Sequence, residues 1–223
     1  MSLLSTLGSK YGTDKVSHGF CDIYDELLSS NRHNITSVME IGVFFGSSLR
    51  MWKEYLPNAE IHGLDHFTGK QGNGSSFYGF MKYFDEQKDN PDPRIKLFKV
   101  DQSSISELNS FASKSEMKYD FILDDGSHLM RDQQLTFAIL FPLVKPGGYF
   151  IIEDVHTSKE KGYDVTEDGS NSTLRMLEKY QSENVWDSKY MTEDQLKYCN
   201  SQTEKVEIRN HGYSMTSIIT KKI

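Results

Sequence analysis

The sequence predicts an α/β domain built on a mostly parallel sheet with helices on both faces. Short apolar runs of strand length alternate along the chain with stretches of helical periodicity, which is typical of βαβ units. Two of these runs end in paired acids, at Asp124-Asp125 and at Glu153-Asp154. The carboxyl ends of parallel strands share one edge of a sheet, and ligands bind there in α/β folds. The last two runs, 204–209 and 214–220, predict an antiparallel hairpin that closes the sheet.

Five strands are expected before that hairpin, at 37–43, 60–65, 95–100, 119–123 and 149–152. Helical patterns are expected at 20–28, after the glycine turn at 44–48 through Trp52, at 104–111 and at 132–143. Lys145-Pro-Gly-Gly148 predicts a tight turn leading into the fifth strand, and Asn210-His-Gly-Tyr213 joins the hairpin. The polar segments 68–76 and 157–172 both follow strand ends, so they are either mobile lids over one edge or passive surface loops.

Composition indicates one globular domain, spanning 1–223, in which residues 1–35 form a helical segment near the active site. The chain has 223 residues, of which 37% are hydrophobic and 12% aromatic. A net charge of −7 argues against a nucleic-acid partner. No apolar run approaches the roughly 20 residues that span a membrane, and the start lacks the features of a signal peptide. Two cysteines suggest no disulfide framework, so a cytoplasmic location is the default expectation.

The turn after the first strand predicts a nucleoside cofactor. Gly42 and Gly46 frame this turn, and Glu40 precedes it on the strand. Asp65, at the end of the second strand, is placed to bind ribose hydroxyls. The turn is neither G-x-G-x-x-G nor a P-loop, so S-adenosylmethionine fits it better than NAD. The alternative is that the glycines only form a turn.

Asp101-Gln102, at the end of the third strand, has an acid and an amide that suit the exocyclic amine of adenine. The alternative is an N-cap, formed by an Asp or Ser before Ile105.

The acids that end the fourth and fifth strands predict a divalent-metal site. Like charges at such short range repel one another unless a cation or proton lies between them. Mg²⁺ prefers a few carboxylates, and the absence of a Cys or multi-His set disfavours zinc. His128 lies three residues beyond Asp125 and is the candidate general base, since imidazole titrates near neutral pH. The alternatives are capping acids and a surface histidine.

Before the first long helix, the segment from Tyr11 to His18 carries the charged residue Lys15. Propensity alone favours a plain charged helix start here. The other interpretation makes Tyr11, Lys15, His18 and the later His156 contacts for cofactor or substrate.

Several motifs resemble the Mg²⁺-dependent sugar O-methyltransferases that act on macrolide deoxysugars, such as those of mycinamicin. The motifs are Gly12-Thr-Asp-Lys15 with His18, Met39-Glu-Ile-Gly-Val43, Leu123-Asp-Asp-Gly-Ser-His128, Lys145-Pro-Gly-Gly148 and Ile152-Glu-Asp-Val-His-Thr-Ser158. The resemblance covers roughly residues 8–158. It implies the class I, Rossmann-like methyltransferase fold with a seven-stranded sheet.

Carried over position by position, the resemblance implies metal ligands at Asp125, Glu153 and Asp154, with His128 as the base. It implies cofactor contacts at Glu40, Gly42, Asp65, Asp101 and Gln102, with Asp124 supporting the cofactor. The acceptor is expected to be a small-molecule or glycan sugar, and the chain could form a homo-oligomer. Alternatives are a methyltransferase for catechol-like phenols, an NAD-type oxidoreductase and a non-catalytic cofactor-binding protein.

Overall fold

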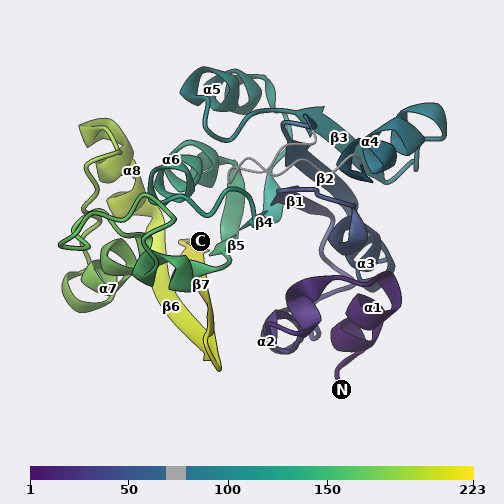
Figure 1. Ribbon diagram of the computed structural model, residues 1–223, viewed down its shortest axis with the longest axis horizontal. Coiled ribbons are helices and arrows are strands. Elements are labelled where there is room, and N and C mark those ends of the chain that lie inside the picture. Colours follow the sequence, from purple (N-terminus) through teal and green to yellow (C-terminus); the bar gives the residue numbers. More distant parts are fainter. Residues whose placement is uncertain (69–78) are drawn as a thin grey trace.

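The computed structural model describes residues 1–68 and 79–223, and its sheet is the predicted one (Figure 1). The strands are β1 Ser37–Ile41, β2 Glu60–Asp65, β3 Ile95–Lys99, β4 Tyr119–Asp124, β5 Val144–Ile152, β6 Thr203–His211 and β7 Ser214–Lys221. They form one seven-stranded sheet in the order β3-β2-β1-β4-β5-β7-β6. The first five strands are parallel to their neighbours, and β7 is antiparallel to both β5 and β6. The C-terminal hairpin is therefore confirmed.

Helices cover both faces of the sheet, as predicted (Figure 1). They are α1 Leu3–Tyr11, α2 Phe20–Leu28, α3 Ser47–Tyr55, α4 Gly79–Asp89, α5 Ile105–Lys114, α6 Met130–Leu140, α7 Thr173–Glu183 and α8 Glu193–Gln202. Short 3₁₀ helices lie at η1 Asp14–Val16, η2 Phe141–Leu143 and η3 Val155–Lys159. Within the described residues, no helix is long and apolar enough to span a bilayer.

Two buried clusters, one on each face, explain why the central strands read as nearly continuous apolar runs. Val38 and Phe121 pack with α1–α3, whereas their neighbours Met39 and Ile122 pack with α5–α8. Successive side chains of a strand point to opposite faces, so a strand covered on both sides needs apolar residues at every position. This double burial fixes the five parallel strands rigidly under the site.

Some predicted boundaries were wrong. The helix expected at 132–143 ends at Leu140 and continues as the 3₁₀ helix η2, because Pro142 lacks the N–H that an α-helix needs. The fifth strand begins at Val144, so Lys145–Gly148 belong to β5, with a register shift against β4 instead of a separate turn. Helices α7 and α8 were not predicted. The predicted loop at 68–76 lies outside the described residues except for Thr68.

The strand order creates a switch point between β1 and β4. These two strands are neighbours, and Ile41 pairs with Asp124 at their carboxyl ends. The chain leaves β1 toward β2 and leaves β4 toward β5, so the connections diverge and leave a crevice between them. The acids predicted to matter lie at this edge.

Away from that edge, His62 in β2 gives a prediction about stability and pH. It is buried, with Nδ1 2.8 Å from the Tyr119 hydroxyl and Nε2 2.5 Å from Glu60. Burial lowers the pKa of His62, although Glu60 opposes this shift. The unfolded chain therefore binds the proton more readily, and the free energy of unfolding falls as the pH drops below about 6.5. We expect His62→Gln to remove the contribution of His62 to this fall in the free energy of unfolding, which is at most about 1.4 kcal/mol per pH unit.

Urea unfolding between pH 5 and 7.5 measures this contribution. His33→Gln is the matched control, because His33 is exposed. Equal pH slopes in the wild type and His62→Gln would contradict the prediction.

Candidate active site

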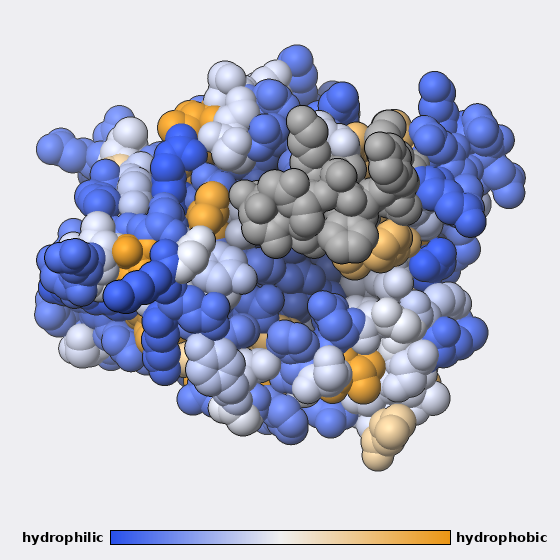
Figure 2. All heavy atoms as spheres, viewed as in Figure 1, coloured by the Kyte–Doolittle hydropathy of each residue, from blue (hydrophilic) through white to orange (hydrophobic). Residues whose placement is uncertain are grey.

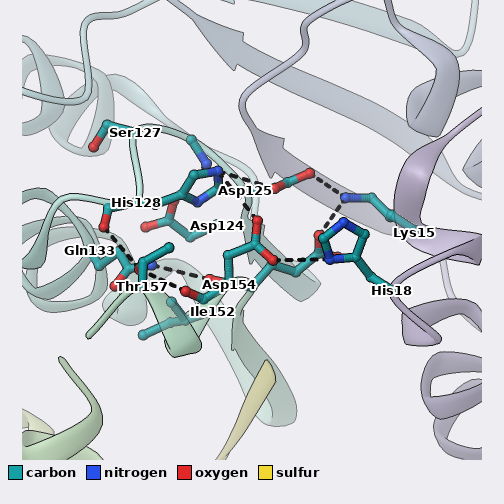
Figure 3. A network of polar contacts seen from close by, with 12 residues as sticks. Lys15, His18, Asp124, Asp125, Ser127, His128, Gln133, Ile152, Asp154 and Thr157 are labelled. Atoms are coloured by element: carbon teal, nitrogen blue, oxygen red, sulfur yellow. Dashed lines mark hydrogen bonds and ion pairs between the residues drawn. The ribbon is translucent and has the colours of Figure 1, made fainter. Parts of the chain in front are cut away.

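Four carboxylates from three neighbouring strands gather at the switch-point edge, and Figure 3 shows two of them, Asp125 and Asp154, beside Lys15 and His128. Glu40 lies on β1 and is fully buried, and Asp125 directly follows β4. Glu153 and Asp154 directly follow β5, and the Glu153 N–H donates to the Asp124 carbonyl at 2.9 Å. The hydrogen bonding between β4 and β5 thus continues one residue past the end of β5 and fixes the positions of Glu153 and Asp154.

Left-handed backbone conformations mark the same edge. Phe44 follows β1 with φ 51°, Phe67 follows β2 with φ 47°, His128 follows β4 with φ 58°, and Asp154 follows β5 with φ 54°. Each such conformation in a non-glycine residue costs on the order of 1–3 kcal/mol and persists only where the surroundings impose it. Their concentration at four strand ends indicates a functional edge rather than scattered loop geometry.

Lys15, from η1, is buried among the acids with 1% of its side chain exposed. Its Nζ donates to Asp125, lies 2.7 Å from Glu153 and lies 3.2 Å from Glu40. Burial alone would lower the pKa of Lys15, but the attraction of the three carboxylates outweighs it and raises the pKa well above its usual value. The interpretation of Lys15 as part of a plain, solvated helix start was therefore wrong.

Glu153 and Glu40 are the two most deeply buried acids beside Lys15. The second oxygen of Glu153 accepts a hydrogen bond of 2.8 Å from the Tyr24 hydroxyl on α2. Burial, and then the charge of Asp125, raise the pKa of Glu153. Burial raises the pKa of Glu40 to about 7, although Lys15 opposes the shift. Within the described chain, neither oxygen of Glu40 has a hydrogen-bond partner.

A more open group lies beside this buried one. His128 Nε2 is 3.5 Å from Asp154 Oδ2 and 4.0 Å from Asp125 Oδ1. One side-chain nitrogen or oxygen atom from each of the three residues lies within 4.8 Å of the others, so the two carboxylates could share a metal ion beside the imidazole. His128 Nδ1 and Asp154 Oδ1 are buried, and neither has a hydrogen-bond partner in the described part of the chain. Such unsatisfied atoms are costly in a finished structure and indicate where a ligand belongs.

Three imidazoles surround Asp154. His18 Nδ1 lies 3.6 Å from Asp154 Oδ1, and His128 faces the other oxygen (Figure 3). His156 Nδ1 lies 3.8 Å from Asp154 Oδ1. His18 is also 3.0 Å from the Ser214 hydroxyl, at the start of β7. Burial raises the pKa of Asp154, and the imidazoles oppose this shift. The N-terminal segment, η3 and the C-terminal hairpin therefore all border the site.

On the cofactor side, the glycine turn lies directly against the metal acids. A Cβ on Gly42, whose φ is +89°, would lie 2.0 Å from the Asp125 carbonyl oxygen. Gly46, with φ +68°, starts α3 beneath the Tyr83 ring. Asp65 accepts hydrogen bonds from the N–H groups of Val43 at 2.9 Å and Phe67 at 2.8 Å. Asp65 thus fixes both turns that flank it.

Gln102 and Asp124 form a buried pair behind the site. The Gln102 amide donates to both oxygens of Asp124 at 2.7 and 2.9 Å, and its carbonyl accepts from Ser127 N–H at 2.8 Å. Burial raises the pKa of Asp124 to about 8. The amide expected to face adenine therefore holds the turn before His128. Asp101 accepts a hydrogen bond from the N–H of Ser103, and Ser104 is the N-cap of α5. The alternative of a serine N-cap before Ile105 is therefore confirmed for Ser104.

Tyr11 does not join this cluster, because its hydroxyl donates to Glu54 on α3. Sequence reasoning missed Tyr24, which was assigned only to an apolar helix face. It also missed Asp164, whose carboxylate accepts from Met130 N–H at 2.6 Å and so caps α6 just after His128. A buried tyrosine generally needs a hydrogen-bond partner, which was the one available signal for Tyr24.

The surface around these elements is mainly hydrophilic. On the face shown in Figure 2, hydrophilic side chains predominate, and hydrophobic residues form small separate patches.

Known proteins show the same architecture. The family model described as a methyltransferase domain matches residues 39–155, more than half of the chain. The mycinamicin VI 2''-O-methyltransferase of Micromonospora griseorubida is 34% identical over 169 residues, covering 72% of this chain and 38% of its own. A tetracenomycin 3'-O-methyltransferase of Streptomyces olivaceus, acting on a methoxy-rhamnosyl derivative, is 31% identical over 169 residues, which again cover 72% of this chain and 38% of its own.

Among solved structures, the methyltransferase MycE in complex with Mg, S-adenosylhomocysteine and mycinamycin VI superposes with a TM-score of 0.72 at 26% identity. The match covers 98% of this chain and 54% of that one. This chain thus spans about half the length of that structure and less than half of the curated relatives. The class I methyltransferase fold implied by the sequence motifs is confirmed. From the family match and the shared fold, we conclude that the chain belongs to the methyltransferase-domain family.

Proposed function

We propose that this protein transfers a methyl group from S-adenosylmethionine to a hydroxyl of a sugar, with Mg²⁺ as the metal. The observation that carries the proposal is the group Asp125, His128 and Asp154, whose ligand atoms lie within 4.8 Å of one another beside the glycine turn. The names of similar proteins support it, because they describe O-methylation of sugars on natural products.

The donor set fits a hard divalent cation. Asp125, Glu153 and Asp154 offer only oxygen atoms, and Asp154 Oδ1 has no hydrogen-bond partner among the described residues. We assign these three acids as the metal-holding residues. Glu153 would bind the metal and still accept the hydrogen bonds of Lys15 and Tyr24, since a carboxylate has about four lone-pair directions. A bound Mg²⁺ would supply stabilisation of the negative charge that develops on the acceptor oxygen.

The cofactor would lie along the β1 turn. The second oxygen of Glu40, which has no partner among the described residues, suits a hydrogen-bond-donating group, and Gly42 and Gly46 let the turn pack closely against Asp125 and Tyr83. Asp65 keeps a lone pair for ribose hydroxyls beyond its three backbone contacts, since a carboxylate has about four lone-pair directions. Asp101, Gln102 and Asp124 would shape the adenine end, with Gln102 and Asp124 acting through the turn they hold.

His128 would act as the general base through Nε2, the nitrogen that faces the acids. The hydroxyl proton passes to Nε2 while the acceptor oxygen bonds to the methyl carbon and the carbon–sulfur bond breaks. The products are a methyl ether, a thioether and an imidazolium that Asp154 and Asp125 stabilise. Because the reacting groups are held in place, positioning contributes much of the rate.

A catechol-like phenol is the second candidate acceptor, since it also offers two neighbouring oxygens. The residues around Asp154 favour a sugar, because His18, His156 and Ser214 supply polar groups there. Transfer of isotope-labelled methyl groups to a panel of rhamnosides, other deoxysugar glycosides and catechols tests this choice. Labelling of catechols alone would overturn the sugar assignment.

Loss of the metal acid Asp154 should weaken metal binding strongly. We expect Asp154→Asn to reduce Mg²⁺ affinity by at least about 10–100-fold, the range found when metal-site partners are removed. Turnover at low Mg²⁺ should fall with it, and added Mg²⁺ should restore part of the loss. Calorimetric titration and rates at varied Mg²⁺ provide the measurements. Asp187→Asn, at a carboxylate that is 61% exposed, should change neither quantity.

A further inference from the structure

We propose that the ammonium of Lys15 occupies a second cation position of this centre, in place of a second metal ion. This inference rests on the proposed metal site, and it concerns a position that the proposed Mg²⁺ does not use. The centre would then hold one exchangeable cation near His128 and one cation tethered to the N-terminal segment.

The geometry around Lys15 Nζ is that of a small cation among oxygen ligands. Nζ contacts one carboxylate from each of three strand ends: Glu40 at 3.2 Å on β1, Glu153 at 2.7 Å after β5, and Asp125 after β4. Hard divalent ions are held by such sets of carboxylate oxygens. The three acids converge on one point because their strands are adjacent in the sheet.

Burial makes a cation at this point necessary. Glu40 is 0% exposed and Glu153 is 2% exposed, so water cannot solvate their charges. Removing the partner of a buried charge leaves that charge uncompensated, which strongly destabilises the fold. Glu40 completes the set, because its Oε1 lies 3.2 Å from Nζ while its other oxygen is buried without a hydrogen-bond partner among the described residues.

Asp125 connects the two positions. Its Oδ2 binds Lys15, while its Oδ1 faces His128 Nε2 at 4.0 Å, within the group suited to a metal ion. This is how a bridging carboxylate lies between two ions. Lys15 would thereby set the orientation of Asp125 and make a single divalent ion sufficient. The N-terminal segment becomes part of the metal centre.

Counting the divalent ions bound per chain tests this inference. Removing the ammonium with Lys15→Ala leaves space and three carboxylates, so the variant should bind one Mn²⁺ more than the wild type. Mn²⁺ is the probe because calorimetry gives its stoichiometry and electron paramagnetic resonance reports two neighbouring Mn²⁺ ions. The double variant Lys15→Ala/Glu40→Gln lacks one ligand of the new position and should lose the additional ion.

Lys10→Ala is the matched control, because Lys10 also lies in the N-terminal segment but pairs with Glu54 at the exposed surface. It should bind as many Mn²⁺ ions as the wild type. If Lys15→Ala unfolds without metal, Mn²⁺ should restore its Tm by a larger shift than it gives the wild type.

A Lys15→Ala variant with the wild-type Mn²⁺ count, or one that Mn²⁺ stabilises no more than the wild type, would overturn the inference. A wild type that binds no Mn²⁺ would instead contradict the proposed metal dependence. The difference of one ion between variant and wild type would still test the role of Lys15.

Discussion

Replacing His128 with alanine is expected to lower kcat for methyl transfer by about 10²–10⁴-fold, the usual contribution of a general base. Nε2 of His128 faces Asp154 Oδ2 at 3.5 Å and Asp125 Oδ1 at 4.0 Å, so it lies where an acceptor held by the metal acids would present its hydroxyl. The imidazole lies after β4, whereas the glycine turn that borders the cofactor side follows β1. Affinity for S-adenosylmethionine should therefore stay within about twofold, since the loss is confined to the proton transfer. Single-turnover rates and cofactor calorimetry measure the two effects separately.

Two controls distinguish catalysis from folding in this experiment. His33→Ala removes an exposed imidazole and should leave kcat unchanged. The unfolding free energy of His128→Ala should be measured as well, because His128 adopts φ 58° in the turn before α6. A stable His128→Ala enzyme with wild-type kcat would contradict the assignment of His128 as the base.

The central sheet was predictable because its physical signal is local. Strands covered on both faces, such as β1 and β4, must be apolar at nearly every position, and each predicted run overlaps the observed strand. Helix α7 escaped prediction although Leu174, Leu177 and Tyr180 repeat at helical spacing, because the polar residues between them dominate its composition. The bulged start of β5 escaped because Pro146 and two glycines signal a turn locally, whereas pairing of Val144 with Tyr119 of β4 makes the segment part of the strand.

The candidate site also contains residues that could be predicted from the sequence and residues that could not. That the acids meet follows from strand topology alone, so Asp125, Glu153 and Asp154 could be grouped from the sequence. Lys15 could not be placed, because a lysine in a short polar segment is usually solvated, and only the packing of η1 against three strand ends buries it. Gln102 was expected to contact the adenine of a ligand. Its hydrogen bonds to Asp124 could not be predicted, because they link two strand ends that lie apart in the sequence.

Gly42→Ala is expected to destabilise the protein by roughly 2–5 kcal/mol and to abolish measurable cofactor binding, combining backbone strain with overpacking. The added Cβ would lie 2.0 Å from the Asp125 carbonyl oxygen and 2.7 Å from its carbon. Both are backbone atoms, so no side-chain rotation relieves the overlap, and φ +89° adds strain for any L-residue. Either the β1 turn or the β4 end must move, which displaces the cofactor side from Asp125. Urea unfolding and cofactor calorimetry measure the two effects.

Gly169→Ala separates these two causes. Gly169 also has a positive φ, of +64°, but an added Cβ there would meet no atom within 4 Å. It should therefore cost only the left-handed strain, about 1–2 kcal/mol, and leave cofactor affinity unchanged. If Gly42→Ala proved no more destabilising than Gly169→Ala, the close contact between the turn and Asp125 would not be present in solution. The cofactor turn and the metal acid would then be free to move independently, and the methyl donor would not be positioned by the residue that positions the acceptor.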